Sequence, residues 1–323
     1  MDKNTKIYVA GHCGLAGSAI VRELIAQGFT NIVTRTREQL DLLDGASTID
    51  FFKQERPRIV FLAAAKVGGI HANNMFPVDF LMQNICIQTN VFQASYQVSV
   101  DRLIFLGSSC IYPRDCPQPI KEGYLLTGPL EHTNRPYAIA KIAGVEMCWS
   151  YNRQHKTKWL AAMPTNLYGP GDNYDLVTAH VLPALIRKMH EAKLTGSNEV
   201  NLWGSGTPRR EFLYSEDLAR ALIFLVFLDD QKYNTLTSPS ICPLINVGCG
   251  SDISIAELAR VIAQEVGYAG AFVYDRTKPD GTMQKKLDIS KLSALGWRQT
   301  IPLAKGISSA YKAFLLTDVS VAA

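Results

Sequence analysis

The chain has 323 residues, which favours two structural units, and with 47% hydrophobic and 19% charged residues its composition is that of an ordinary globular protein. The net charge of +4 is too small to indicate a nucleic-acid-binding surface. The seven cysteines form no Cys-x-x-Cys pair, which argues against a zinc site and a disulfide framework. No apolar run is long enough for a signal peptide or a membrane span. These features predict a cytoplasmic protein without a metal.

A glycine-rich turn follows the first predicted strand, residues 7–10, and precedes a helical run over residues 18–27. Gly11 permits a tight turn, Gly14 lets the backbone approach a pyrophosphate, and Gly17 allows close helix packing. A glycine triplet alone is weak evidence, but a strand, turn and helix in this order indicate a dinucleotide site. The predicted site consists of Gly11, His12, Cys13, Gly14, Leu15, Ala16 and Gly17.

The second predicted strand, residues 31–34, ends where dinucleotide-binding folds usually place a carboxylate for the ribose. Arg35 and Arg37 stand here instead, and guanidinium groups suit a 2′-phosphate, so the sequence favours NADP over NAD. Arg37 is the better candidate, with Arg35 as a solvated charge, while Glu38 leaves NAD open. Asp41 and Leu42 are expected to border the adenine, ahead of a helix over residues 45–55.

Two more strands are predicted over residues 58–64 and 102–107, with a long helix over residues 77–97 between them. Ligands of doubly wound sheets bind beyond the carboxyl ends of the strands. The small side chains of Ala63 and Ala64 leave room for a cofactor there. The turn Ser108-Ser109-Cys110 is expected to face the same cofactor.

Tyr137 and Lys141 lie four residues apart in a segment with a helical pattern, so both side chains leave one face of the helix. A lysine cation beside a tyrosine favours the phenolate, and such a pair can exchange a proton with an alcohol near neutral pH. The same spacing also occurs by chance on helix surfaces. The pair therefore gains its weight from the motifs around it.

These motifs together resemble the extended short-chain dehydrogenase/reductase family, in which a Gly-x-x-Gly-x-x-Gly turn, a serine after the fourth strand and Tyr-x-x-x-Lys follow in this order. The GDP-L-fucose synthases of that family are the narrower resemblance, carried by residues 64–74, 107–113, 134–144, 164–171, 203–212 and 278–282. The resemblance implies an α/β fold, with a Rossmann-type doubly wound parallel sheet and a smaller C-terminal α/β substrate domain. It further implies 3,5-epimerisation of GDP-4-keto-6-deoxy-mannose and its NADPH-dependent reduction at C4.

The resemblance also assigns catalytic roles. Ser108 is expected to bind the C4 carbonyl, Tyr137 to donate the proton, and Lys141 to hold the nicotinamide ribose and lower the pKa of the tyrosine. Cys110, as a thiolate if nearby cations depress its pKa, is the expected base of epimerisation, and His180 the opposing acid. The alternatives are an inert buried cysteine and a solvated histidine.

Further contacts are implied by the same resemblance. The cofactor contacts are Ala63, Ala64, Leu106, Gly107, Ser109, Lys141, Pro164, Thr165, Asn166, Leu167 and His180. The substrate contacts are Asn166, Lys188, Trp203, Arg210, Asp280 and Lys285. Arg209 is expected to be a spare surface charge. Cys13 and Lys188 stand where arginines are expected, which weakens a strict NADP preference and removes bidentate phosphate binding, respectively.

A dinucleotide domain is expected over residues 1–175, with return segments at about 212–229 and 244–249, and a substrate domain over residues 176–323. Residues 231–243 are expected to be a surface loop. The family implies a homodimer through helices of the dinucleotide domain, and the apolar stretch over residues 80–94 fits either that contact or burial in one subunit. Three alternatives remain: a 4-epimerase with retained NAD, a non-catalytic NADPH sensor, and an RNA-binding relative.

Overall fold

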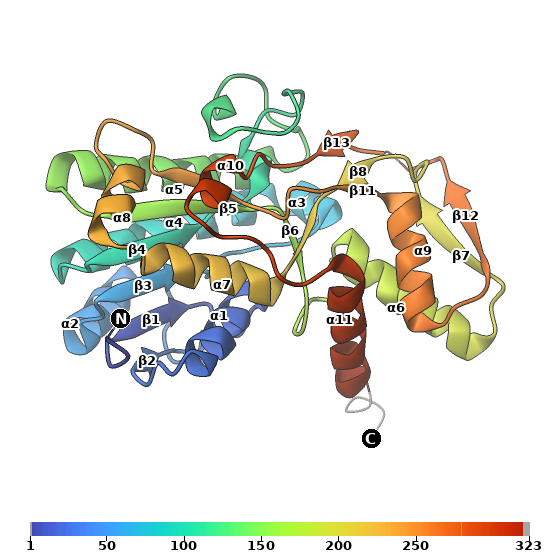
Figure 1. The fold of residues 1–323 in the computed structure, drawn as a ribbon, viewed down its shortest axis with the longest axis horizontal. Coiled ribbons are helices and arrows are strands. Elements are labelled where there is room, and N and C mark those ends of the chain that lie inside the picture. The colour runs from blue at the N-terminus through green and yellow to red at the C-terminus, as the bar shows by residue number, and fades with distance from the viewer. Residues whose placement is uncertain (1, 279, 319–323) are drawn as a thin grey trace.

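The computed structural model describes residues 2–278 and 280–318, and a six-stranded parallel sheet forms one half of it (Figure 1). The strand order is β10-β5-β4-β3-β1-β2. The strands are β1 (Ile7–Ala10), β2 (Ile32–Val33), β3 (Ile59–Leu62), β4 (Arg102–Leu106), β5 (Trp159–Pro164) and β10 (Leu244–Val247). The chain passes from β1 to β2 on one side and then to β3 on the other, so the connections change direction between β1 and β3. The predicted Rossmann-type doubly wound sheet is confirmed.

Helices cover both faces of this sheet. One face packs against α1 (Leu15–Ala26) and α7 (Ser215–Val226), and the other against α2 (Gly45–Glu55), α4 (Pro77–Gln97) and α5 (Arg135–His155). Successive residues of a strand point to opposite faces, so Phe61 enters one core and Val60 the other. Because both faces are covered, the strands are mainly apolar, and Arg102 at the start of β4 and Asn246 in β10 are the exceptions.

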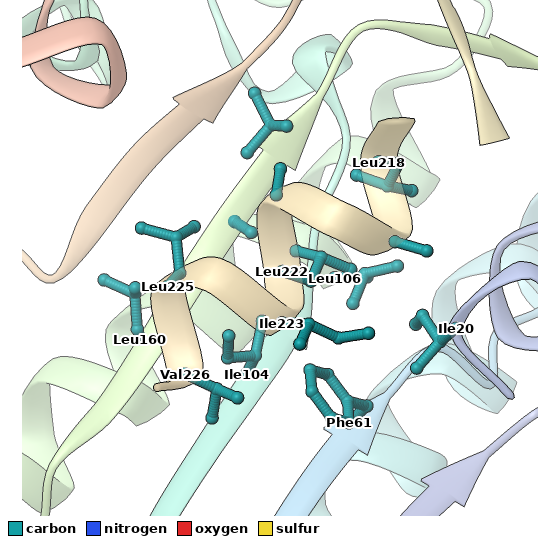
Figure 2. Packing of buried hydrophobic residues seen from close by; sticks show 14 of the residues in the cluster. Ile20, Phe61, Ile104, Leu106, Leu160, Leu218, Leu222, Ile223, Leu225 and Val226 are labelled. Atoms are coloured by element: carbon teal, nitrogen blue, oxygen red, sulfur yellow. The ribbon is translucent and has the colours of Figure 1, made fainter. Parts of the chain in front are cut away.

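Figure 2 shows the core under α7. Leu222 and Ile223 project from this helix toward β3 and β4, where Phe61 and Ile104 lie. All four side chains are at most 1% exposed. Close apolar packing therefore holds α7 to the sheet. This packing also fixes the position of the residues directly before α7.

The rest of the molecule is a smaller lobe, to the right in Figure 1. Its core joins α6 (Val181–Thr195), α9 (Ile255–Val266) and α11 (Leu303–Asp318). Three small sheets complete it: β7 (Glu199–Trp203) with β12 (Ala271–Asp275), β6 (Asn166–Tyr168) with β9 (Phe212–Tyr214), and β8 (Arg209–Arg210) between β11 (Ile253–Ser254) and β13 (Gln284–Lys285).

The expectation of a surface loop over residues 231–243 is wrong in its first part, because α8 (Asp230–Leu236) occupies it. Asp229 caps this helix by accepting the backbone N–H of Lys232, and Tyr233 is fully buried. One buried aromatic residue is too little periodicity to indicate a helix. The remaining short elements are α3 (Ile70–Met75), α10 (Ser290–Ala294), η1 (Ser109–Ile111) and η2 (Glu122–Tyr124).

Neither a membrane-spanning helix nor a metal-binding cluster occurs in the part of the chain that the structure describes. No helix there is both long and apolar enough to cross a bilayer. No group of three or more His, Cys, Asp or Glu residues there could hold a metal ion.

Truncation of the packed face of α7 should destabilise the fold. We expect Leu222→Ala to lower the free energy of unfolding by about 2–5 kcal/mol, because the lost apolar contacts leave a cavity. Urea unfolding followed by circular dichroism measures the change. The control is Leu316→Ala in α11, where the side chain is 79% exposed and we expect a change below about 0.5 kcal/mol. Equal effects of the two substitutions would contradict this account of the core.

Candidate active site

The glycine-rich turn joins β1 to α1 at the carboxyl edge of the sheet. Gly11 has a φ of 83°, and Gly14 begins α1 without a side-chain cap. A Cβ on Gly17 would lie 2.1 Å from the carbonyl oxygen of Gly11, and one on Gly11 would lie 2.6 Å from the nitrogen of Ala64. Larger residues would therefore force the turn apart. The first amides of α1 have no side-chain partner, as a pyrophosphate site requires.

Within this turn His12 and Cys13 form a contact of their own. The Cys13 thiol is exposed and lies 3.3 Å from Nε2 of His12. A neutral thiol adds no positive charge for a phosphate. Leu15 and Ala16 follow as the first helical residues.

The two arginines after β2 differ in their partners. Arg35 forms an ion pair with Glu55 at 2.7 Å and lies over the ring of Phe51. Arg37 is 69% exposed and pairs only loosely with Asp41, at 3.6 Å. Leu42 beside them is buried. Arg37 is thus the more exposed and less tightly paired of the two guanidinium groups.

The ends of β3, β4 and β5 leave little room for side chains. A Cβ on Gly107 would lie 1.8 Å from Cε of Met163, so a larger residue there would displace this methionine side chain. The N–H of Ala63 donates to the carbonyl oxygen of Ala10, and the N–H of Thr165 donates to that of Val247. These two bonds extend the sheet pairing by one residue. Small residues thus keep this edge open, next to the glycine-rich turn.

Lys141 is buried beneath the predicted catalytic tyrosine. Its Nζ donates to the carbonyl oxygen of Leu106 at 2.9 Å and lies 5.7 Å from the ring centre of Tyr137. Burial lowers the pKa of Lys141 to about 8. Burial also raises the pKa of Tyr137 far above its usual value. The expected lowering of this tyrosine pKa is absent from the free protein, and Tyr137 is a phenol, the form that donates a proton.

Cys110 lies in η1, directly after β4, with 6% of its surface exposed. Its backbone N–H donates to Oγ of Ser108 at 3.4 Å. Burial raises the pKa of the Cys110 thiol, while Lys285, Ser108 and Lys141 act in the opposite direction. Burial dominates, so the depressed pKa expected from nearby cations is absent and Cys110 rests as a thiol. Lys285 reaches this group from the smaller lobe.

His180 is the residue that begins α6. The loop before it is tied to the segment after β3, because the N–H of Gly69 donates to the carbonyl of Thr178 at 3.1 Å. His180 is an exposed residue, and desolvation by the neighbouring protein atoms lowers the pKa of its imidazole. A neutral imidazole is the resting form that this environment favours.

Trp203, at the end of β7, has two lysine cations close to its ring. Lys188 lies 5.4 Å and Lys278 5.6 Å from its ring. The indole is 59% exposed, and Lys188 also donates to the carbonyl of Asn201 at 3.2 Å. An exposed indole with two ammonium groups nearby suits a planar base with phosphates.

Arg210 and Lys285 are paired in register between β8 and β13. Burial lowers the pKa of Arg210, and Asp280 opposes that shift. Asp280 itself accepts the backbone N–H of Ser205 at 2.7 Å. Two cations side by side provide the positive charge that a diphosphate would require.

The expectation that Arg209 is a spare surface charge is wrong. Its guanidinium lies 3.1 Å from Asp252 and 3.4 Å from Glu257. Glu257 belongs to the first turn of α9, so Arg209 joins this helix to β8.

Sequence reasoning missed Glu211, a fully buried carboxylate next to Arg210. Its backbone oxygen accepts Nδ2 of Asn166 at 2.9 Å and the hydroxyl of Thr165 at 3.1 Å. The available signal was an acid directly before the apolar strand Phe212–Tyr214. Its partners are distant in sequence, so the pattern alone gave no role.

One large surface hollow lies away from these residues. It measures about 530 Å³, lies at the opposite edge of the sheet, and has arginines that are already paired: Arg58 with Asp101 and Arg102 with Asp230. The second measures about 390 Å³. It is lined by Arg209, Arg210, Phe212, Cys249, Ile253, Leu303 and neighbouring residues. The chemistry above therefore favours the smaller hollow as part of the site.

Comparison with known proteins gives consistent relatives. The model of the NAD dependent epimerase/dehydratase family matches residues 7–235. A putative GDP-L-fucose synthase 2 of Arabidopsis thaliana is 52% identical, covering 98% of this chain and 93% of that protein. GDP-L-fucose synthase of Escherichia coli K12 is 50% identical, with 96% of each chain covered. The structure of a GDP-L-fucose synthetase from Naegleria fowleri bound to NADP has a TM-score of 0.89 and 28% identity, covering 99% of this chain and 95% of that one.

The chain therefore belongs to the NAD-dependent epimerase/dehydratase family and, within it, to the GDP-L-fucose synthases. This confirms the resemblance drawn from the sequence motifs.

The pKa of Lys141 predicts how NADPH binding depends on pH. Below about 8 its ammonium is charged, and above that value the buried group loses its proton. We expect the affinity for NADPH to fall as the pH rises through about 8, because a neutral amine binds the cofactor less well. Fluorescence titration of NADPH over a pH series measures this. Lys141→Met should bind weakly without that transition, and the same transition in the variant would contradict the assignment.

Proposed function

We propose that this protein converts GDP-4-keto-6-deoxy-D-mannose to GDP-L-fucose by 3,5-epimerisation and NADPH-dependent reduction at C4. One observation carries the proposal: Ser108, Cys110 and Lys141 meet at the end of β4, where Lys285 arrives from the other lobe. Proton-transfer groups and a phosphate-binding cation thus share one edge. The curated relatives named GDP-L-fucose synthase support the substrate.

The residues at the glycine-rich turn fit a dinucleotide phosphate. Gly11, Gly14 and Gly17 hold the backbone open to the pyrophosphate, Arg37 reaches the 2′-phosphate, and Lys141 holds the nicotinamide ribose. The other cofactor contacts in the proposal are His12, Cys13, Leu15, Ala16, Asp41, Leu42, Ala63, Ala64, Leu106, Gly107, Ser109, Pro164, Thr165, Asn166, Leu167 and His180. NADPH, when bound, supplies the hydride for C4.

Epimerisation uses the acidity that the 4-keto group gives to C3 and C5. Cys110 removes a proton from one face of the ring, the charge collects on the C4 oxygen, and His180 returns a proton to the opposite face. Because Cys110 rests as a thiol and His180 as a neutral imidazole, a proton must first pass from the thiol to the imidazole through water. This transfer gives the thiolate base and the imidazolium acid that the step requires. During reduction Tyr137 donates its proton to the C4 oxygen. Ser108 orients this oxygen by a hydrogen bond.

The nucleotide part of the substrate is held by the smaller lobe in this proposal. Arg210 and Lys285 bind the diphosphate, and Trp203 with Lys188 borders the base and phosphates. Asn166 and Asp280 complete the set of substrate contacts. Buried cations pair strongly with a diphosphate, which offsets the cost of their burial.

We also propose that the chain has the domain division expected from the sequence, forms a homodimer and is cytoplasmic. In the stretch over residues 80–94, Phe80 and Phe92 are buried within the subunit. Val78 and Met82 on α4 and Ile139 on α5 are exposed by 69%, 50% and 40%, and they are the side chains that a helix-mediated dimer would cover. Light scattering gives the mass in solution, and a monomer would contradict the dimer.

NADPH oxidation with GDP-4-keto-6-deoxy-mannose, followed by NMR identification of the sugar product, tests the function. We expect GDP-fucose. GDP-rhamnose would show that Cys110 and His180 are not a working epimerase pair and that the enzyme is a plain 4-reductase. NADPH binding without oxidation would favour another sugar nucleotide or a sensor.

Single substitutions should separate the two half-reactions. We expect Cys110→Ser and His180→Asn to slow epimerisation by about 100-fold or more, because each loses a proton-transfer group. Tyr137→Phe should lose reduction while it still exchanges the C3 and C5 protons with deuterated solvent. NMR of that exchange, alongside NADPH affinity as a control for folding, distinguishes the variants. A fully active Tyr137→Phe enzyme would refute the role of the phenol.

A further inference from the structure

Glu211 is a fully buried carboxylate that joins distant segments through backbone N–H groups. Its Oε1 accepts the N–H of Cys249 at 2.6 Å and that of Gly250 at 2.7 Å, directly after β10. Its Oε2 accepts the N–H of Leu287 at 2.8 Å, just after β13. The two oxygens therefore hold two different parts of the chain at a fixed separation.

Neighbouring residues restrict the position of Glu211. A Cβ on Gly248 would lie 2.4 Å from Oε1 of Glu211, so a larger residue there would displace the carboxylate from its hydrogen bonds. The carbonyl oxygen of Glu211 accepts side-chain bonds from Thr165 and Asn166, which follow β5. Glu211 thus ties β8 to the ends of β5 and β10 and to the segment after β13.

Two of these ties lead directly to the cations at the diphosphate site. Arg210 is the residue before Glu211, and Lys285 is two residues before Leu287. Their strands pair in parallel with Arg210 opposite Lys285. The other ties lead to the parallel sheet, whose carboxyl edge carries Cys110 and Lys141. A buried carboxylate is costly unless its oxygens are hydrogen-bonded, and here both oxygens are.

We propose that Glu211 is the positioning residue that sets Arg210 and Lys285 at a fixed place over the catalytic edge of the sheet. Glu211 acts through these neighbours and does not itself touch the substrate. The inference rests on the proposed function, because it takes the two cations as the binding site of a nucleoside diphosphate sugar. Its consequence is selective: loss of the carboxylate weakens substrate binding and leaves NADPH binding intact.

Asp217 provides a matched control for a merely structural role. This carboxylate is 1% exposed and accepts the N–H and hydroxyl of Thr300, at 3.1 and 2.9 Å, and the N–H of Ile301 at 2.8 Å. Like Glu211, it therefore joins distant parts of the chain through backbone N–H groups, here α7 and the segment before α11. None of its partners is a predicted cofactor or substrate contact.

The experiment compares Glu211→Gln with Asp217→Asn in the full-length protein. In Glu211→Gln the amide oxygen can keep Cys249 and Gly250, but the amide nitrogen then faces the N–H of Leu287, and two donors oppose each other. We expect both variants to lower the melting temperature. Only Glu211→Gln should raise the KM for GDP-4-keto-6-deoxy-mannose, by about tenfold. The Kd for NADPH should stay within about twofold of wild type in both.

An unchanged KM in Glu211→Gln, or an equal rise in Asp217→Asn, would overturn the proposal. So would a parallel loss of NADPH affinity, because Glu211 would then act on the whole fold. Should Glu211→Gln not fold, Glu211→Asp must give the same selective rise in KM, since it keeps the charge and shortens the reach.

Calorimetric titration with GDP separates this inference from the proposed function. A wild-type enzyme without turnover of GDP-4-keto-6-deoxy-mannose would refute the proposed function, and the GDP titration would still decide on Glu211. We expect Glu211→Gln to bind GDP about tenfold more weakly than wild type and Asp217→Asn to match wild type. Equal GDP affinities in all three proteins would refute the positioning role.

Discussion

The hydrogen bond from Lys141 to the carbonyl oxygen of Leu106 holds the predicted catalytic helix against the sheet. It joins α5 to the last residue of β4, and it lies out of water. The approach is close enough that a Cβ on Gly144 would lie 2.3 Å from the ring of Phe105. A charge-assisted bond of this kind contributes roughly 1.5–3 kcal/mol, and it places Tyr137 above the turn that carries Ser108 and Cys110.

The sequence predicted those elements whose burial leaves a local pattern. The strands Ile7–Ala10 and Leu244–Val247 have the bounds that their short, mainly apolar runs indicate, although Asn246 lies within the second. The helices over residues 45–55 and 77–97 were bounded by an Asp44 cap and by Pro77. The helix Asp230–Leu236 was missed because it buries little apolar surface and has no such periodicity.

The site divides in the same way. Tyr137 and Lys141 are four residues apart, so the sequence places them on one helix face, and the structure bears out that geometry. Glu211 bonds to Cys249 and Leu287, which lie 38 and 76 residues away, so only the folded chain brings them together. The pKa of Cys110 was equally out of reach, since the burial that raises it is a property of the folded chain.

One polar arrangement around the C4 oxygen serves both steps of the proposed reaction. The C3 and C5 protons are acidic only while C4 is a ketone, so epimerisation has to precede reduction. During epimerisation the C4 oxygen carries the charge of an enolate, and during reduction it carries that of an alkoxide. Burial keeps Tyr137 protonated, and Ser108 lies at the same edge, so both can donate hydrogen bonds to this oxygen in either state. The high pKa of Tyr137 thus opposes a phenolate but suits a hydrogen-bond donor. Such a donor stabilises negative charge on the C4 oxygen in both steps and gives up its proton only in the reduction.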